Sequence, residues 1–329
     1  GGEKKSVALE QRYQHAGRMR YPELRRRAMK EICDIIAEFE RRRGEPLALA
    51  TLVKARGSSY RRAGARMLMT AGGATVGTLS GGCLEEEVAG RAREVIATGV
   101  PLLLRFDTRL RYGCHGAIDI FVEPVRPELL DHLAAAQRDR RECLLATVFE
   151  NDDSLGSEIL FSLAEARSDA FVQTIPPPLR LLLIGSGPDS KPLSALAAVL
   201  GWDVIETEDA SNLPNDFDQW TAALVKTHNY GRDYAALARL LPLGLRYLGL
   251  LGPRRRRDQL LHTLIEAGVE MKSQLFSPAG LDLGAESPEE IALAIIAEIQ
   301  STFARASAES LRARKTPIHP ASERAAALR

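Results

Sequence analysis

Cys83 stands where a thiol could do chemistry, directly after Gly81 and Gly82 and just before a helix predicted from Leu84. The unpaired amides at a helix N-terminus stabilise a thiolate, the form of cysteine that attacks electrophiles and binds metals. The glutamates at residues 85–87 oppose this effect, because nearby negative charge raises the pKa of a thiol. Two interpretations stay open: a reactive thiol on a loop that glycines open to a ligand, and a small thiol buried under the helix.

Cys114 repeats this arrangement, because it lies in a Gly-Cys-His-Gly segment just before a strand predicted over residues 117–122. Cys83, Cys114 and His115 could in principle share a metal ion. No Cys-x-x-Cys pair or second histidine cluster supplies four ligands at a familiar spacing, so we predict no metal site. The candidate residues for chemistry are Cys83 first and Cys114 second.

A third segment, GSSYRRAG at residues 57–64, combines hydroxyls, arginines and flexible backbone. This composition can hold a phosphate or another oxyanion. The alternative is an ordinary turn between two strands.

In the second half of the chain, Gly185, Ser186 and Gly187 lie between a predicted strand and a predicted helix. That context turns a weak glycine pattern into a candidate dinucleotide loop, and Glu208 lies where a ribose-binding acid is expected. Against it, Pro188 lacks an amide donor and the next residue, Asp189, adds negative charge where a pyrophosphate would bind. A working nucleotide site and a tight turn without a ligand both stay open.

His228 follows another predicted strand, so we expect it at the carboxyl ends of the sheet, where such folds bind ligands. The alternative is an ordinary loop histidine. Gly249 and Gly252 form a second glycine turn ahead of the arginines at residues 254–257. Of these, Arg254 could clamp a phosphate and the other three are expected to face solvent.

The composition restricts the class of protein. A chain of 329 residues is long enough for two ordinary domains, and its net charge of +1 gives no general attraction to nucleic acid or to an acidic membrane. Four cysteines are too few for a secreted disulfide framework, and Cys33 and Cys143 fall on apolar faces where they are predicted to be structural. The sequence contains no run of ~18 apolar residues, so it predicts no membrane span. We therefore expect a cytoplasmic protein.

The first half has the pattern of an α+β domain. A helix with one apolar face ends at Gly44, and another begins at Leu84 and is closed by Gly99. Strands are predicted over residues 47–53, 66–70, 75–79, 102–106, 117–122 and 143–149.

Beyond three consecutive prolines the pattern changes to alternating strands and helices, which is typical of a parallel sheet. Strands are predicted over 179–184, 203–205, 222–225 and 247–250, and helices over 193–200, 233–241 and 254–267. The last helix begins with a capping box at Ser287 and runs to residue 304.

The predicted fold class is α/β, an N-terminal α+β domain followed by a Rossmann-like doubly wound domain with a mainly parallel sheet. The predicted divisions are a flexible tail at 1–28, the α+β domain at 29–172, a proline-rich linker at 173–178, the Rossmann-like domain at 179–304 and a polar tail at 305–329.

Three N-terminal strings, GSSYRRAGARM, GTLSGGCLEEEV and GCHGAIDIFVEP, together resemble the XdhC/CoxI family of maturation factors for molybdenum hydroxylases. In the second half, LLLIGSGPDS, VKTHNYGRDYAALARLL, YLGLLGPRRR and PAGLDLGAESPEEIALAIIAEI look like the Rossmann domain of the same family in the same order. The resemblance covers about residues 29–303.

This resemblance implies a chaperone more than a turnover enzyme. Such a factor binds molybdenum cofactor (molybdopterin), protects it while a cysteine desulfurase helps to install a terminal sulfur ligand, and delivers it to xanthine dehydrogenase or a related molybdenum hydroxylase. By position, the implied cofactor-binding residues are Gly57, Ser58, Ser59, Arg61, Gly64, Gly81, Gly82, Cys83, Glu85, Cys114, Gly116, Gly185, Gly187, His228, Asp233, Gly249 and Gly252. A nucleotide at the Rossmann-like domain and a homodimer stay open.

The chain also departs from the family pattern. Members commonly have prolines where this chain has Tyr60, Arg62 and Ala63, and His-Val where it has Pro188 and Asp189. Two other functions compete with the one that the resemblance implies. One is an NAD-dependent oxidoreductase with a cysteine-containing substrate domain, and the other is an interaction module that docks through the basic helix at residues 28–43.

Overall fold

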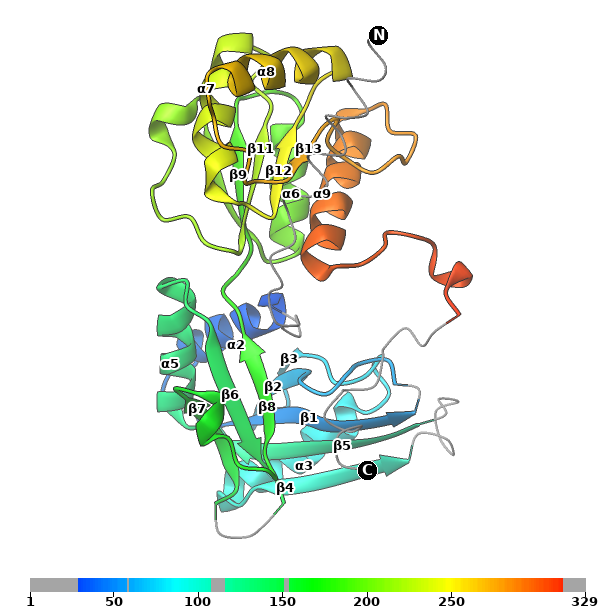
Figure 1. Cartoon of the computed structure of the whole chain (residues 1–329). Helices are drawn as coiled ribbons and strands as arrows, with labels where there is room; N and C mark the ends of the chain where they lie inside the picture. The colour runs from blue at the N-terminus through cyan, green and yellow to red at the C-terminus, as the bar shows by residue number, and fades with distance from the viewer. Residues whose placement is uncertain (1–28, 58, 108–115, 151–153, 316–329) are drawn as a thin grey trace. The chain divides into compact units, whose positions relative to one another are not determined.

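The computed structural model describes residues 29–57, 59–107, 116–150 and 154–315, and these divide into two compact units between Pro177 and Pro178 (Figure 1). We call residues 29–177 the antiparallel unit and residues 178–315 the parallel unit. The predicted tail at 1–28 lies outside the described residues. No helix in the described part of the chain has the length and apolar character that a membrane span requires.

The antiparallel unit contains two sheets. The larger sheet has the strand order β3-β2-β1-β5-β4, with every neighbouring pair antiparallel, and the smaller has the order β7-β6-β8. The strands are β1 (Leu47–Gly57), β2 (Arg66–Thr70), β3 (Thr75–Gly77), β4 (Leu102–Asp107), β5 (Gly116–Pro124), β6 (Cys143–Val148), β7 (Gly156–Leu160) and β8 (Phe171–Ile175).

Helices cover both faces of the larger sheet. Successive side chains of a strand point to opposite faces, so Ala50 and Leu52 of β1 pack toward α3 (Glu85–Thr98), while Leu49 packs toward α2 (Met29–Arg41) and α5 (Pro127–Arg138). Each buried methylene group contributes about 0.8 kcal/mol. These two apolar clusters fix the position of the sheet. The sheet in turn carries the loop that precedes β2 and the turn that follows β3.

The parallel unit is a five-stranded parallel sheet in the order β10-β9-β11-β12-β13. Its strands are β9 (Arg180–Ile184), β10 (Asp203–Thr207), β11 (Thr221–Val225), β12 (Tyr247–Leu250) and β13 (Leu275–Phe276). Its helices are α6 (Ser190–Val199), α7 (Tyr230–Leu240), α8 (Arg254–Glu266) and α9 (Pro288–Ala304), with short 3-10 turns at Ala210–Asn212, Leu241–Leu243 and Leu311–Ala313.

The helices of the parallel unit lie in two pairs, α6 beside α9 and α7 beside α8 (Figure 1). Because both sheet faces are covered, β9, β11 and β12 are buried along their whole length. The chain leaves β9 toward β10 on one side and later enters β11 on the other. Loops at the carboxyl ends of β9 and β11 therefore flank a topological switch point, the usual ligand position in such sheets.

The predicted fold class is confirmed, and the last helix starts and ends as predicted. The Ser287 hydroxyl accepts from the amide of Glu290, and the Glu290 carboxylate accepts from the amide of Ser287 at 3.0 Å. One prediction was wrong. Gln173, Thr174 and Ile175 were assigned to the linker, but they end strand β8, because each pairs with a residue of β6. The prolines that cannot pair begin only at residue 176.

Candidate functional site

Cys83 lies on an exposed turn between β3 and α3, and of the cysteines that the structure describes it is the exposed one. Gly82 has a φ of +107° and open space where a side chain would stand. The ring of Tyr60, itself 72% exposed, lies against Gly81, 3.7 Å from the position that a Cβ would take. The thiol therefore stands on an accessible surface with a flat aromatic ring nearby.

Glu85 organises this turn from inside. Its carboxylate accepts hydrogen bonds from the amides of Leu79 (3.1 Å), Ser80 (2.7 Å) and Leu84 (3.1 Å), and from the Ser80 hydroxyl (2.6 Å). Burial acts to raise the pKa of Glu85, but the hydrogen bonds from Ser80 and the backbone amides outweigh it and lower that pKa. Glu85 thus fixes the backbone on both sides of Cys83.

A pH-dependent effect of Glu85→Gln follows from this geometry. The folded-state pKa lies below the ordinary value of 4.5, so the stabilisation is complete above pH 4.5 and is lost as the pH falls through the lower value. We expect the variant to be less stable than the wild type by about 1–2 kcal/mol near pH 7, with a smaller difference near pH 3.5. Thermal unfolding at both pH values measures it.

Glu86→Gln is the matched control, because Glu86 lies exposed in the same first turn of α3. It should leave the stability nearly unchanged at both pH values. An equal, pH-independent loss in the two variants would contradict the role of Glu85.

Arg61 ties the 57–64 segment to the turn that carries Cys83. Its guanidinium donates to the Thr78 hydroxyl at 2.7 Å and to the Glu31 carboxylate at 2.5 Å, and Glu31 also accepts from the amide of Arg66 at 2.8 Å. The Ser59 hydroxyl donates to the carbonyl of Arg61 at 2.6 Å. The sequence-predicted Ser59 and Arg61 are therefore held by internal contacts beside the Cys83 turn.

The end of the segment is fixed by a buried arginine. Arg66 donates from Nη1 to the carbonyl of Gly64 (3.1 Å) and to the side chain of Gln173 (2.6 Å). Gly64 has a φ of +102°, and a Cβ there would lie 2.8 Å from Gln173. Burial lowers the pKa of Arg66 to about 10, although Glu31 and Glu123 act to raise it.

Strand pairing brings two further predicted residues together. Gly57 at the end of β1 lies opposite Gly116 at the start of β5. Ser58 and Cys114 were also predicted in the site, but they lie outside the described residues. Cys143 is buried in β6, where burial raises the pKa of its thiol, in line with the structural role predicted for it.

In the parallel unit, Gly185 brings the loops after β9 and β11 into contact. Its φ is +101°, and a Cβ there would lie 2.5 Å from the Cα of Thr227, so no other residue fits. His228, which follows Thr227, is exposed and has a φ of +55°. The Ser186 hydroxyl donates to Glu208 at 3.2 Å, so the loop after β10 joins the same edge.

Asp233 is completely buried behind this edge. It accepts from the Thr227 hydroxyl at 2.5 Å and forms an ion pair with Arg256. The prediction that the arginines after Arg254 all face solvent was therefore wrong, because Arg256 is drawn in by this pair and Arg257 donates to the carbonyl of Ser277 at 2.9 Å.

The two later glycines have different surroundings. A Cβ at Gly249 would lie 2.8 Å from Leu224 and 2.9 Å from the Tyr247 ring, so packing alone requires glycine there. Gly252, with a φ of +153°, begins the turn into α8 and leaves room beside Arg256.

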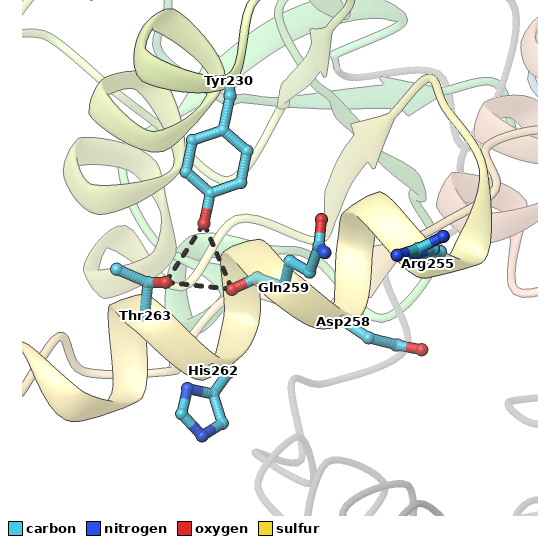
Figure 2. A pocket seen from close by; sticks show the side chains of 6 residues that line it. All are labelled: Tyr230, Arg255, Asp258, Gln259, His262 and Thr263. Carbon is cyan, nitrogen blue, oxygen red and sulfur yellow. Dashed lines mark hydrogen bonds between the residues drawn. The ribbon is translucent and has the colours of Figure 1, made fainter.

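An open groove is lined by residues of α7 and α8. Figure 2 shows Tyr230 of α7 pointing onto α8, where its hydroxyl meets the Thr263 hydroxyl at 3.1 Å and the carbonyl of Gln259 at 3.3 Å. None of the residues that line the groove was predicted as a site residue from the sequence. They are Tyr230, Arg255, Asp258, Gln259, His262 and Thr263. Within the described ranges, no group of three or more His, Cys, Asp or Glu side chains could hold a metal ion.

Comparison with known proteins agrees with this architecture. Residues 40–107 match the model of the XdhC and CoxI family, and residues 181–299 match the XdhC Rossmann domain. A probable xanthine dehydrogenase subunit of Bacillus subtilis (strain 168) is 32% identical, over 79% of this chain and 94% of the relative. The chain belongs to the XdhC and CoxI family. The resemblance seen in the sequence is thereby confirmed.

Two other proteins are similar to this chain over most of its length. The molybdenum cofactor insertion chaperone PaoD of Escherichia coli (strain K12) is 26% identical, over 78% of this chain and 84% of PaoD. The crystal structure of a xanthine dehydrogenase from Bacillus halodurans has a TM-score of 0.70 and 26% identity, and covers 84% of this chain and 98% of that one.

Proposed function

We propose that this chain binds molybdenum cofactor at the Cys83 turn, supports its sulfuration, and delivers it to xanthine dehydrogenase or a related molybdenum hydroxylase. The observation that carries the proposal is the exposed Cys83 thiol on an open glycine turn beside the exposed Tyr60 ring. The chain's membership of the XdhC and CoxI family and its similarity to the insertion chaperone PaoD support the same role.

The chemistry of these residues suits that cargo. A thiolate is a soft ligand that can approach a metal centre with exchangeable positions. An exposed aromatic ring can stack on the flat pterin, a contact worth about 1–3 kcal/mol for comparable heteroaromatic rings. The open space at Gly82 lets a ligand come close to the backbone next to the thiol.

Arg61 contributes mainly by position in this proposal. Because its guanidinium is engaged by Glu31 and Thr78, it holds the loop of Tyr60 against the turn of Cys83. The partners in the proposal are the hydroxylase client and a cysteine desulfurase that supplies the sulfur.

The test measures pterin retained by protein purified from cells that make molybdenum cofactor. Wild-type protein should carry near-stoichiometric pterin, detected by fluorescence after release. Cys83→Ser removes the soft sulfur and Tyr60→Ala removes the ring, and each is expected to weaken pterin binding about tenfold or more, a loss of at least ~1.4 kcal/mol, so that less pterin is retained through purification.

The controls are Cys33→Ser, which removes a partly buried thiol on α2, and Tyr60→Phe, which keeps the ring. Both should retain pterin as the wild type does. A wild-type protein that carries no pterin and does not stimulate a client hydroxylase would refute the proposed function.

A further inference from the structure

A fully buried lysine lies beneath the glycine loop of the parallel unit. Lys226 directly follows β11, and its Nζ donates to the Ser190 hydroxyl at 2.5 Å and lies 3.6 Å from Oδ2 of Asp189. A buried ammonium group requires compensation, because its desolvation is costly. Asp189 supplies the opposite charge at the N-cap position of α6.

The carboxylate of Asp189 fills the space beside Gly187. A Cβ at Gly187 would lie 2.7 Å from Oδ1 of Asp189 and 3.8 Å from Nζ of Lys226. In dinucleotide-binding loops the second glycine lets the backbone approach a pyrophosphate at the helix N-terminus. Here the chain's own carboxylate packs against that glycine.

Two further features indicate that the Asp189 carboxylate occupies the glycine loop in place of a ligand. Asp189 is only 5% exposed, and its buried Oδ2 has no hydrogen-bond partner among the described residues, so its compensation is the Lys226 charge. Pro188 has no amide hydrogen to offer to a ligand phosphate. The positive charge of Lys226 is therefore already balanced by Asp189 without a ligand in the loop.

We propose that Asp189 takes the place of a ligand phosphate in the Gly185–Ser190 loop, so that the parallel unit rejects dinucleotides and free pyrophosphate. Lys226 is the counter-charge that this carboxylate holds. The proposal is independent of pterin binding at Cys83, and it argues against an NAD-dependent oxidoreductase. A ligand of the crevice would have to be held by Ser186, Glu208 and His228 without a phosphate in the loop.

The test is a titration with inorganic pyrophosphate and with NADH by isothermal calorimetry. The wild type should show no saturable binding of either. Asp189→Ala fits the backbone, because Asp189 has helical dihedral angles, with φ of −77° and ψ of −15°. It removes the occupant and leaves Lys226 without its counter-charge, so pyrophosphate should bind saturably, at least about 10- to 100-fold more tightly than the detection limit that bounds wild-type binding, as for hydrogen bonds to charged groups.

The matched control is the double variant Asp189→Ala with Lys226→Met, which removes both charges and should lose the gained affinity. If Asp189→Ala does not fold, Asp189→Ser, whose shorter uncharged side chain also empties the space beside Gly187 and can cap the helix, carries the same comparison. Saturable NADH binding by the wild type, no gain in the single variants, or a gain that persists in the double variant would each overturn the proposal. Pterin retention should be unchanged in the folded variants, which separates this test from that of the proposed function.

Discussion

Gly185→Ala is expected to lower the free energy of unfolding of the parallel unit by about 3–5 kcal/mol. The added methyl group would stand 2.5 Å from the Cα of Thr227 and 2.7 Å from its amide nitrogen, and the backbone φ is +101°. Neither neighbour is a flexible side-chain end that could move aside. The collision and the backbone strain therefore add.

Urea unfolding followed by tryptophan fluorescence measures this effect directly. The chain has two tryptophans, Trp202 and Trp220, and both are buried in the parallel unit. Gly268→Ala is the matched control, since its φ is +74° but nothing lies within 4 Å of the added group. The control should cost about 1 kcal/mol. Equal losses in both variants would show that collision with Thr227 is not the cause.

Asp233→Ala is expected to destabilise the same unit by about 3–4 kcal/mol. The substitution leaves Arg256, whose side chain is 19% exposed, without its ion-pair partner, and it removes one of the two acceptors of the Thr227 hydroxyl, the other being the carbonyl of Asn229. It also takes a negative charge from the first turn of α7, where such a charge is favourable. The measurement is again urea unfolding by tryptophan fluorescence.

Asp258→Ala provides the comparison, because Asp258 pairs with Arg257 but is itself 58% exposed. Exposed pairs contribute roughly 0–1 kcal/mol, so this variant should remain close to the wild type. A loss for Asp233→Ala no larger than that for Asp258→Ala would mean that the buried pair contributes little.

Local signals in the sequence were sufficient for most of the fold. Gly99 adopts the left-handed conformation that ends α3, and Ser287 caps α9, because both depend on residues within one turn of the chain. The alternation of buried strands and helices likewise predicted the parallel sheet. Such features need no information about distant partners.

The elements that were missed depend on more subtle signals. Helix α5 was not predicted, although Pro127 at its first turn and Leu129, Leu130 and Leu133 on its buried side fit a helix. Strand β8 was partly assigned to the linker because prolines follow it, yet Gln173 is buried against Arg66. Only the tertiary contact explains a buried glutamine there.

The candidate site was also predicted only in part, because its contacts between distant segments could not be predicted from the sequence. The loops of Tyr60 and Cys83 were both predicted as candidate regions, but nothing in the sequence indicated that Arg61 would pair with Glu31 of a preceding helix. Asp189 was predicted to oppose a pyrophosphate, but its pairing with Lys226 joins segments that are distant along the chain. Charge pairs between distant segments are determined by the folded structure.

The four hydrogen bonds accepted by Glu85 have a consequence for ligand exchange. A turn that is already ordered before a ligand arrives loses little conformational entropy on binding, so a few modest contacts can suffice for capture. Few contacts also have to be broken when another protein competes for the ligand. A rigid turn that presents a thiol at the surface is therefore suited to holding a ligand until another protein takes it over.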